Sequence, residues 1–278
     1  MGHAGDCVHI GDRESDIYEL SCLAEELKTH FLVRTCVNRL ADDGERTVAA
    51  RMKKAVVKGR HRIVVRNKNG DLHEADLEIK FERLLVLPPI GKRRDYPGLT
   101  LTVIHAVERG TPSGREKIAW KLATNLPVKS LAQAIEKLNW YAMRWKIEVF
   151  HKILKSGCKA GEFKLRSSER PVNLVALLRI VGWRVFWLTM PHRAEPGAPW
   201  AGALAPTEVR VLDELVKTKP GAARRATISD CILKTARLGG HLARAADPPP
   251  GNMAIWRGLS RLTDIHLGFS LAAKLVGN

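Results

Sequence analysis

The stretch CVHIGDRESDIYELSCLAEELKTHFLVRTC, residues 7–36, decides the class of fold. It begins with the apolar run CVHI and ends with the apolar run FLVRTC, and both runs are typical of buried strands. Between them, apolar residues recur at helical spacing, at Ile17, Leu20, Leu23 and Leu27. Ser15 or Asp16 is suited to cap the start of this helix. The stretch therefore predicts a strand, a helix and a parallel strand, which form one βαβ unit of an α/β protein.

Few residues precede this βαβ unit, since Cys7 already opens its first strand. A strand at the edge of a sheet exposes backbone N–H and C=O groups that proteins usually cover. We therefore expect further upstream sequence to cover this strand in the complete protein.

The next part of the chain, up to residue 125, is predicted to be mainly β-structure. RTVAARMKKAVVK (46–58) has the pattern of a basic helix. HRIVVRNKNGDLHEADLEIKFERLLVL (61–87) alternates with period two around an Asn-Gly turn, which predicts a hairpin. LTLTVIHAVE (99–108) and KIAWKLATN (117–125) predict two further strands.

The rest of the chain is helical in pattern, so the fold class is α/β (α+β) with a helical C-terminal module. The predicted helices cover 129–156, 170–190, 206–217, 227–238 and 253–275. The longest apolar stretch, 172–190, carries Arg179 and Arg184 in its interior, which argues against a membrane span. The N-terminus also lacks the apolar region of a signal peptide.

The composition points to a globular protein with a polyanionic partner. The chain has 278 residues, and 46 Lys and Arg against 29 Asp and Glu give a net charge of +17. Its 45% hydrophobic content is enough for a core and excludes wholesale disorder. The five cysteines are scattered and form no CxxC pair, which indicates a reduced, cytoplasmic protein and argues against a zinc site.

The chemistry of the chain is concentrated in LNWYAMRWKIEVFHKILKSGCK, residues 138–159. On one continuous helix, Tyr141, Arg144, Glu148 and Lys155 would share an arc of about 60° beside the apolar face. A carboxylate flanked by cations and a phenol suits a site where a metal ion meets phosphates. An i,i+4 ion pair between Arg144 and Glu148 on an exposed helix face is the simpler alternative, and spacing alone leaves both open.

Asp12 directly follows the first predicted strand. Acidic side chains at the carboxyl edge of a sheet commonly bind metal ions. The alternative is a turn or capping aspartate, because Glu14, Ser15 and Asp16 crowd a helix N-terminus, which favours negative charge.

Four motifs together resemble one known family. They are GDRESDIYEL (11–20), FLVR (31–34), the Y-x2-R-x3-E-x6-K pattern of Tyr141 to Lys155, and ARLGG (236–240). In combination they look like the cut-and-paste DDE transposases of the Tn-five kind, in the IS-four superfamily, and the similarity runs essentially end to end. The resemblance implies a ribonuclease-H-like catalytic core over 1–192, with a β-rich insertion at about 37–125. It implies a helical dimerisation domain over 193–278, where Gly239 and Gly240 are also suited to end a helix.

The resemblance implies catalytic roles for two carboxylates. Asp12 resembles the second aspartate of the DDE triad and Glu148 resembles its glutamate, which in the family bind Mg²⁺ or Mn²⁺. The family's N-terminal DNA-binding domain and the strand that carries the first aspartate have no counterpart in this chain. Asp6 lies before the first strand and cannot replace that aspartate. The implied two-metal site is therefore short of one carboxylate.

The resemblance also implies DNA contacts. Tyr141, Arg144 and Lys155 resemble residues that contact transposon-end phosphates, and Trp120 matches a position whose indole handles a flipped base. Arg34 matches a strand-end arginine close to bound DNA. The remaining candidate contacts are the basic residues beside Asp12 and the helical stripe, Arg13 and Lys152.

These implications lead to two interpretations of function. The first is a transposase fragment of cut-and-paste DNA transposition, for metal-dependent cleavage and strand transfer at transposon ends, which we expect to be inactive alone. The second is a non-catalytic DNA-binding and dimerisation protein that inhibits a full-length transposase. Both imply double-stranded DNA and either a second copy or a full-length relative as partners, on the nucleoid of a bacterial cytoplasm.

Overall fold

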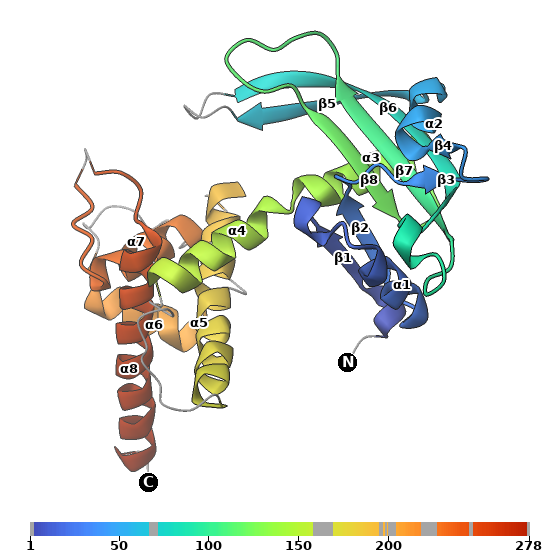
Figure 1. Cartoon of the computed structure of the whole chain (residues 1–278). Coiled ribbons are helices and arrows are strands. Elements are labelled where there is room, and N and C mark those ends of the chain that lie inside the picture. The colour runs from blue at the N-terminus through green and yellow to red at the C-terminus, as the bar shows by residue number, and fades with distance from the viewer. Residues whose placement is uncertain are drawn as a thin grey trace. The chain divides into compact units, whose positions relative to one another are not determined.

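The computed structural model describes residues 3–66, 72–157, 169–194, 197, 199, 204–217, 227–244 and 247–276. The chain divides into two compact units, Met1–Arg144 and Trp145–Asn278, which we call the sheet unit and the helical unit (Figure 1). This division lies well before the predicted domain boundary between residues 192 and 193. The predicted helix over 129–156 therefore contributes to both units.

The sheet unit is built on one mixed sheet. Its described strands are β1 (Val8–Gly11), β2 (His30–Arg34), β3 (Leu40–Ala41), β4 (Arg46–Thr47), β5 (Gly59–Arg66), β6 (Leu72–Val86), β7 (Leu99–Glu108) and β8 (Ala119–Thr124). Their spatial order is β1-β2-β8-β7-β6-β3-β4, and β5 pairs with β6 (Figure 1). Strands β1 and β2 are parallel and every other pairing is antiparallel. The general α+β class is confirmed by this arrangement.

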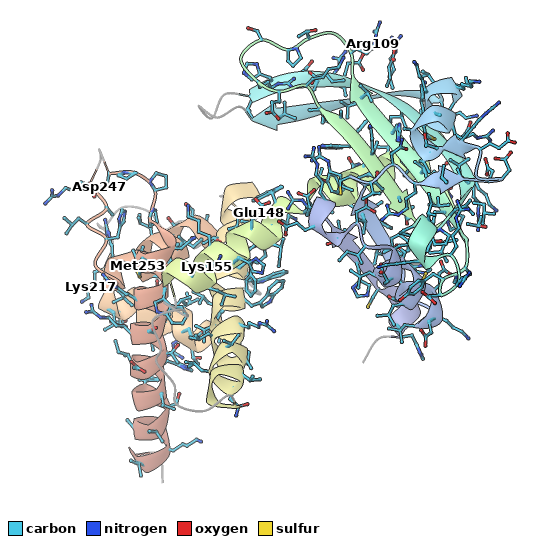
Figure 2. The ribbon with its side chains drawn as sticks, viewed as in Figure 1. Arg109, Glu148, Lys155, Lys217, Asp247 and Met253 are labelled. Atoms are coloured by element: carbon cyan, nitrogen blue, oxygen red, sulfur yellow. The ribbon has the colours of Figure 1, made fainter. Side chains whose placement is uncertain are left out.

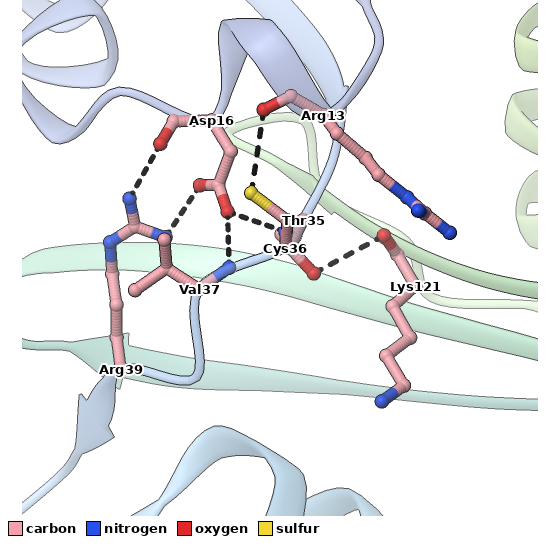
Figure 3. A network of polar contacts seen from close by, with 7 residues as sticks. All are labelled: Arg13, Asp16, Thr35, Cys36, Val37, Arg39 and Lys121. Carbon is pink, nitrogen blue, oxygen red and sulfur yellow. Dashed lines mark hydrogen bonds and ion pairs between the residues drawn. The ribbon is translucent and has the colours of Figure 1, made fainter.

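The predicted βαβ unit is present, but its helix begins differently. Strand β1 is followed by α1 (Tyr18–Glu26) and then by β2, with Val8 paired to His30. The N-cap of α1 is Ile17, which makes no side-chain cap, so the prediction that Ser15 or Asp16 caps the helix is wrong. The Asp16 carboxylate instead accepts the backbone N–H groups of the loop after β2 and forms an ion pair with Arg39 (Figure 3). The contacts of Asp16 with Arg39 and with the loop after β2 thus take the place of a cap on α1.

The β-rich segment is confirmed in most of its elements. Strands β5 and β6 pair antiparallel from Gly59 to Arg66, and the basic helix is α2 (Val48–Lys54). Strand β7 covers the predicted LTLTVIHAVE, and β8 covers most of KIAWKLATN. The Asn-Gly turn of the hairpin lies outside the described residues.

Each face of the sheet is covered by different helices. Helix α3 (Leu131–Ala142) packs on one face, where Leu32, Leu122 and Leu138 are fully or almost fully buried. Helices α1 and α2 pack on the opposite face, against Phe31, Val103 and other strand residues. Because side chains alternate along a strand, neighbouring residues of β8 face different helices. We call these the α3 face and the α1/α2 face.

Strand β1 is a terminal strand of the sheet, and in the described part of the chain it pairs with β2 alone. A cavity of about 310 Å³ lies beside β1 and α1. Large apolar side chains line this cavity and remain substantially exposed: Ile10, Leu20, Leu23 and Leu27. The expectation that further sequence covers this edge stays a prediction.

The helical unit packs helices around its own core. Its described elements are α4 (Trp145–Lys152), a π-helical turn (Ile153–Gly157), α5 (Glu169–Ala194), α6 (Pro206–Leu215), α7 (Ile228–Leu238) and α8 (Asn252–Val276). Helices α5 to α8 match the predicted helical segments closely. Gly240, with a φ of +94°, follows α7 in the left-handed region expected of a helix-ending glycine.

Helix α5 is the one described helix that is long and apolar enough, from Val172 to Met190, to cross a membrane. Val185 and Leu188 of this helix are nevertheless buried in the core of the helical unit. Arg184 forms an ion pair with Glu208 of α6. A single helix of this kind is weak evidence for a membrane span.

Candidate nucleic-acid site at the end of strand β1

Asp12 lies directly after β1, at the N-terminus of the short 3₁₀ turn Arg13–Ser15. Its Oδ1 accepts the backbone N–H of Arg13 at 2.8 Å and the hydroxyl of Tyr141 at 3.2 Å. Its Oδ2 lies 3.4 Å from Nη2 of Arg144. Both oxygens of the carboxylate are thus engaged by donors from the sheet unit.

Tyr141 connects Asp12 to the α3 face of the sheet. The phenol ring is 4% exposed and belongs to the core between α3 and the sheet. Its edge packs against Trp120 of β8, with ring centroids 5.3 Å apart and planes at 74°. Arg34, at the end of β2, donates from Nη2 to the carbonyl oxygen of Ala119 at 3.4 Å. The Tyr141 phenol and the Arg144 guanidinium therefore contact the Asp12 carboxylate, the charge of Arg34 acts on it, and Trp120 packs behind Tyr141.

The charges around Asp12 favour its ionised form. Burial by itself raises the pKa of Asp12, but the Arg13 N–H and the Arg144 charge act in the opposite direction. The Tyr141 hydroxyl and the Arg34 charge add to this, so the pKa of Asp12 lies below its ordinary value. Burial raises the pKa of the Tyr141 phenol, so its hydroxyl keeps its proton and can donate at neutral pH.

Five of the predicted site residues meet in the sheet unit, although they come from distant parts of the chain: Asp12, Arg34, Trp120, Tyr141 and Arg144. Arg13 is exposed and adjoins Asp12. The other three predicted residues belong to the helical unit, where Glu148 and Lys152 are exposed on α4 and Lys155 is exposed on the following π-helical turn. Figure 2 labels Glu148 and Lys155.

The predicted continuous helix over 129–156 is wrong, because it is interrupted at Met143 and Arg144. The backbone N–H of Arg144 donates to the carbonyl of Tyr141, a tighter bond than that of an α-helix. No glycine or proline stands at this point, so local propensity does not explain the break. The interruption coincides with the contacts of Tyr141 and Arg144 to Asp12. The four-residue stripe is therefore divided after Arg144.

The metal role predicted for Asp12 and Glu148 stays a prediction. Mg²⁺ and Mn²⁺ prefer several oxygen ligands, and in the sheet unit Asp12 is held by a guanidinium, a phenol and an N–H group. Among the described residues, no three side chains of His, Cys, Asp or Glu gather at one place. Guanidinium groups such as those of Arg34 and Arg144 can bind phosphates, and an indole such as that of Trp120 can stack on a base.

The structural role of Asp16 and Arg39 is visible only in the folded chain. Their side chains are 7% and 11% exposed and fix the loop that follows β2 next to the turn of Arg13. The residues stand far apart in the sequence, and no motif spacing links them. This ion pair positions the edge at which Asp12 lies.

No protein-family model matches the sequence.

Proposed function

We propose that this chain is a DNA-binding protein of the DDE transposase type, whose sheet unit holds duplex DNA at the Asp12 edge. One observation carries the proposal. The residues that the family resemblance singled out in the sheet unit come from four separate segments, and Asp12 and Tyr141 link them into one cluster. A chance similarity of short motifs gives no reason for such convergence.

The chemistry of the cluster fits a DNA backbone and a displaced base. Guanidinium groups such as Arg34 and Arg144 bind phosphate oxygens through paired N–H donors. Trp120 is partly exposed and offers an indole on which a base can stack. The charge of +17 adds attraction that does not depend on sequence.

For the present activity of the chain, we favour binding over catalysis. The family's metal-dependent cleavage with Mg²⁺ or Mn²⁺ would require Glu148 and a further carboxylate beside Asp12. The cations around Asp12 instead suit a site that holds DNA without cutting it. A chain of this kind would inhibit a full-length transposase by occupying its DNA or by pairing with it.

The helical unit supports pairing with a second copy or with a full-length relative. The C-terminal half of α8 exposes several large apolar side chains, namely Leu267, Phe269, Leu271 and Leu275. Leu267, Leu271 and Leu275 recur every four residues and so form one row, whereas Phe269 lies on the other side of the helix. A row of exposed apolar side chains of this kind is typical of a helix that packs against another chain.

We expect the purified chain to bind unrelated duplexes with similar affinity and with a steep loss on added salt, since phosphate contacts release counterions. Affinity is measured by fluorescence anisotropy at several salt concentrations. In the same titration, Arg144→Ala should weaken binding more than Lys152→Ala, because Arg144 borders the Asp12 cluster. Strong preference for one sequence at physiological salt, or equal effects of the two variants, would contradict the proposal.

A further inference from the structure

A row of basic side chains crosses the sheet on the α1/α2 face. The strand register pairs Lys80 of β6 with His105 of β7, and His105 with Lys121 of β8. Register partners on neighbouring strands point to the same face. Val103, two residues from His105, packs against α2, which identifies this face. We call Lys80, His105 and Lys121 the basic row.

The carboxylates closest to the basic row along β6 are already paired with other cations. Glu78 and Glu82 stand two residues on either side of Lys80 and point to its face. Nε of Arg109 lies 3.2 Å from Glu78, and Nη2 of Arg51 lies 3.9 Å from Glu82. Arg109 also contacts Asp76, and Arg51 also contacts Asp42. The ion pairs of Glu78 and Glu82 thus go to these two arginines and not to Lys80.

The two lysines of the basic row make hydrogen bonds to neighbouring segments, Lys80 through its side chain and Lys121 through its backbone. Nζ of Lys80 donates to the carbonyl oxygens of Met52 and Lys53, at 3.4 Å and 3.1 Å, at the end of α2. At the other end, the carbonyl of Lys121 accepts the backbone N–H of Thr35 at 2.7 Å, in the loop that the Arg13 turn contacts through Cys36 (Figure 3). The row thus lies on the rigid part of the sheet and not on a loop.

The pKa of His105 is affected by its burial and by the two neighbouring lysines. Burial, followed by the charges of Lys121 and Lys80, lowers the pKa of His105 to about 4. The imidazole is therefore neutral at pH 7 between two ammonium groups. An anion placed on the row would oppose the effect of the two lysine charges and so raise the pKa of His105.

We propose that the basic row is a second DNA-binding surface, which takes backbone phosphates on the face of the sheet opposite to Trp120. Trp120 and Lys121 are adjacent on β8 and point to opposite faces. The exposed Lys53 and Lys54 of α2 extend the positive surface beyond Lys80. Together the two surfaces would allow the sheet unit to hold two segments of DNA. This inference rests on the proposed function in taking DNA as the ligand.

The test compares Lys121→Gln with Lys129→Gln, which removes the same charge from an exposed position outside the row. Duplex affinity is measured against salt for both variants. Lys121→Gln should weaken binding by roughly three- to tenfold and reduce the salt slope by about 1, whereas Lys129→Gln should leave both unchanged. Equal duplex affinities of the two variants would contradict the proposal of a second DNA-binding surface.

A second measurement, made on the full chain, detects DNA at the basic row itself. The pKa of His105 is measured by NMR with and without a saturating unrelated duplex, and it should rise by about one unit or more when phosphates occupy the row. An unchanged pKa would overturn the inference, even where Lys121→Gln disturbs folding. Loss of affinity in Arg144→Ala with no effect at His105 would leave the proposed function standing and reject the second surface alone.

Discussion

Gly258→Ala is expected to unfold the helical unit. A Cβ atom at Gly258 of α8 would lie 1.8 Å from the carbonyl oxygen of Thr235 in α7, and one at Gly239 would lie 1.8 Å from the carbonyl oxygen of Ala254. These are backbone atoms, so no side-chain rotation relieves the overlap, and the two helices must separate. Thr235 is fully buried at this crossing. We expect a loss of more than about 3 kcal/mol, the upper range for an overpacked core.

The matched control is Gly268→Ala on the same helix. Nothing lies within 4 Å of a Cβ atom at Gly268, so the change causes no overlap and only replaces glycine by a residue of higher helix propensity. It should stabilise α8 by up to about 1 kcal/mol. Urea unfolding followed by circular dichroism measures both variants. Similar stabilities for Gly258→Ala and Gly268→Ala would show that α7 and α8 do not cross as closely as described.

The second prediction with a large expected effect is that the chain alone does not cleave DNA. We expect the 278-residue chain alone to leave transposon-end duplexes uncut in Mg²⁺ or Mn²⁺, with no more product than in a chelator control. Two-metal phosphoryl transfer requires several carboxylates that hold two ions on either side of the scissile phosphate. Asp12 is the one carboxylate of its cluster, and Arg144 and Tyr141 engage it.

Supplying a further carboxylate should reverse this result. Co-expression with a fragment of a Tn-five-type transposase that carries the first aspartate of the triad is expected to give metal-dependent nicking. Asp12→Ala and Glu148→Ala should then abolish the activity, whereas Lys129→Gln should retain it. Robust cleavage by the chain on its own would contradict our interpretation of the Asp12 site as incomplete.

The architecture was largely predictable because it follows from local patterns. Period-two alternation identified β5 and β6, and helical patterns identified α1 and α5 to α8. The start of α1 was not predictable, since the Asp16 side chain that could have capped the helix binds Arg39 and the loop after β2. Contacts between residues distant in sequence override local propensity at that point.

The candidate site was predictable only through the family resemblance. Spacing along a helix left Tyr141, Arg144 and Glu148 open to two interpretations, and it did not reveal the break at Met143 and Arg144. The basic row depends on strand register, which pairs His105 with Lys80 and Lys121 across three strands. Alternation within a strand shows which residues share a face, but it does not show which residues lie opposite them.

The most direct test of the central claim follows the Trp120 indole N–H by NMR while unrelated duplex DNA is added to the full chain. Trp120→Phe identifies the signal, and Trp183, on α5 of the helical unit, serves as an internal control. We predict a saturable shift of the Trp120 signal that tracks DNA binding and is reduced in Arg144→Ala, with little change at Trp183. DNA binding that leaves the Trp120 signal unchanged would contradict the assignment of the Asp12 cluster as the DNA site.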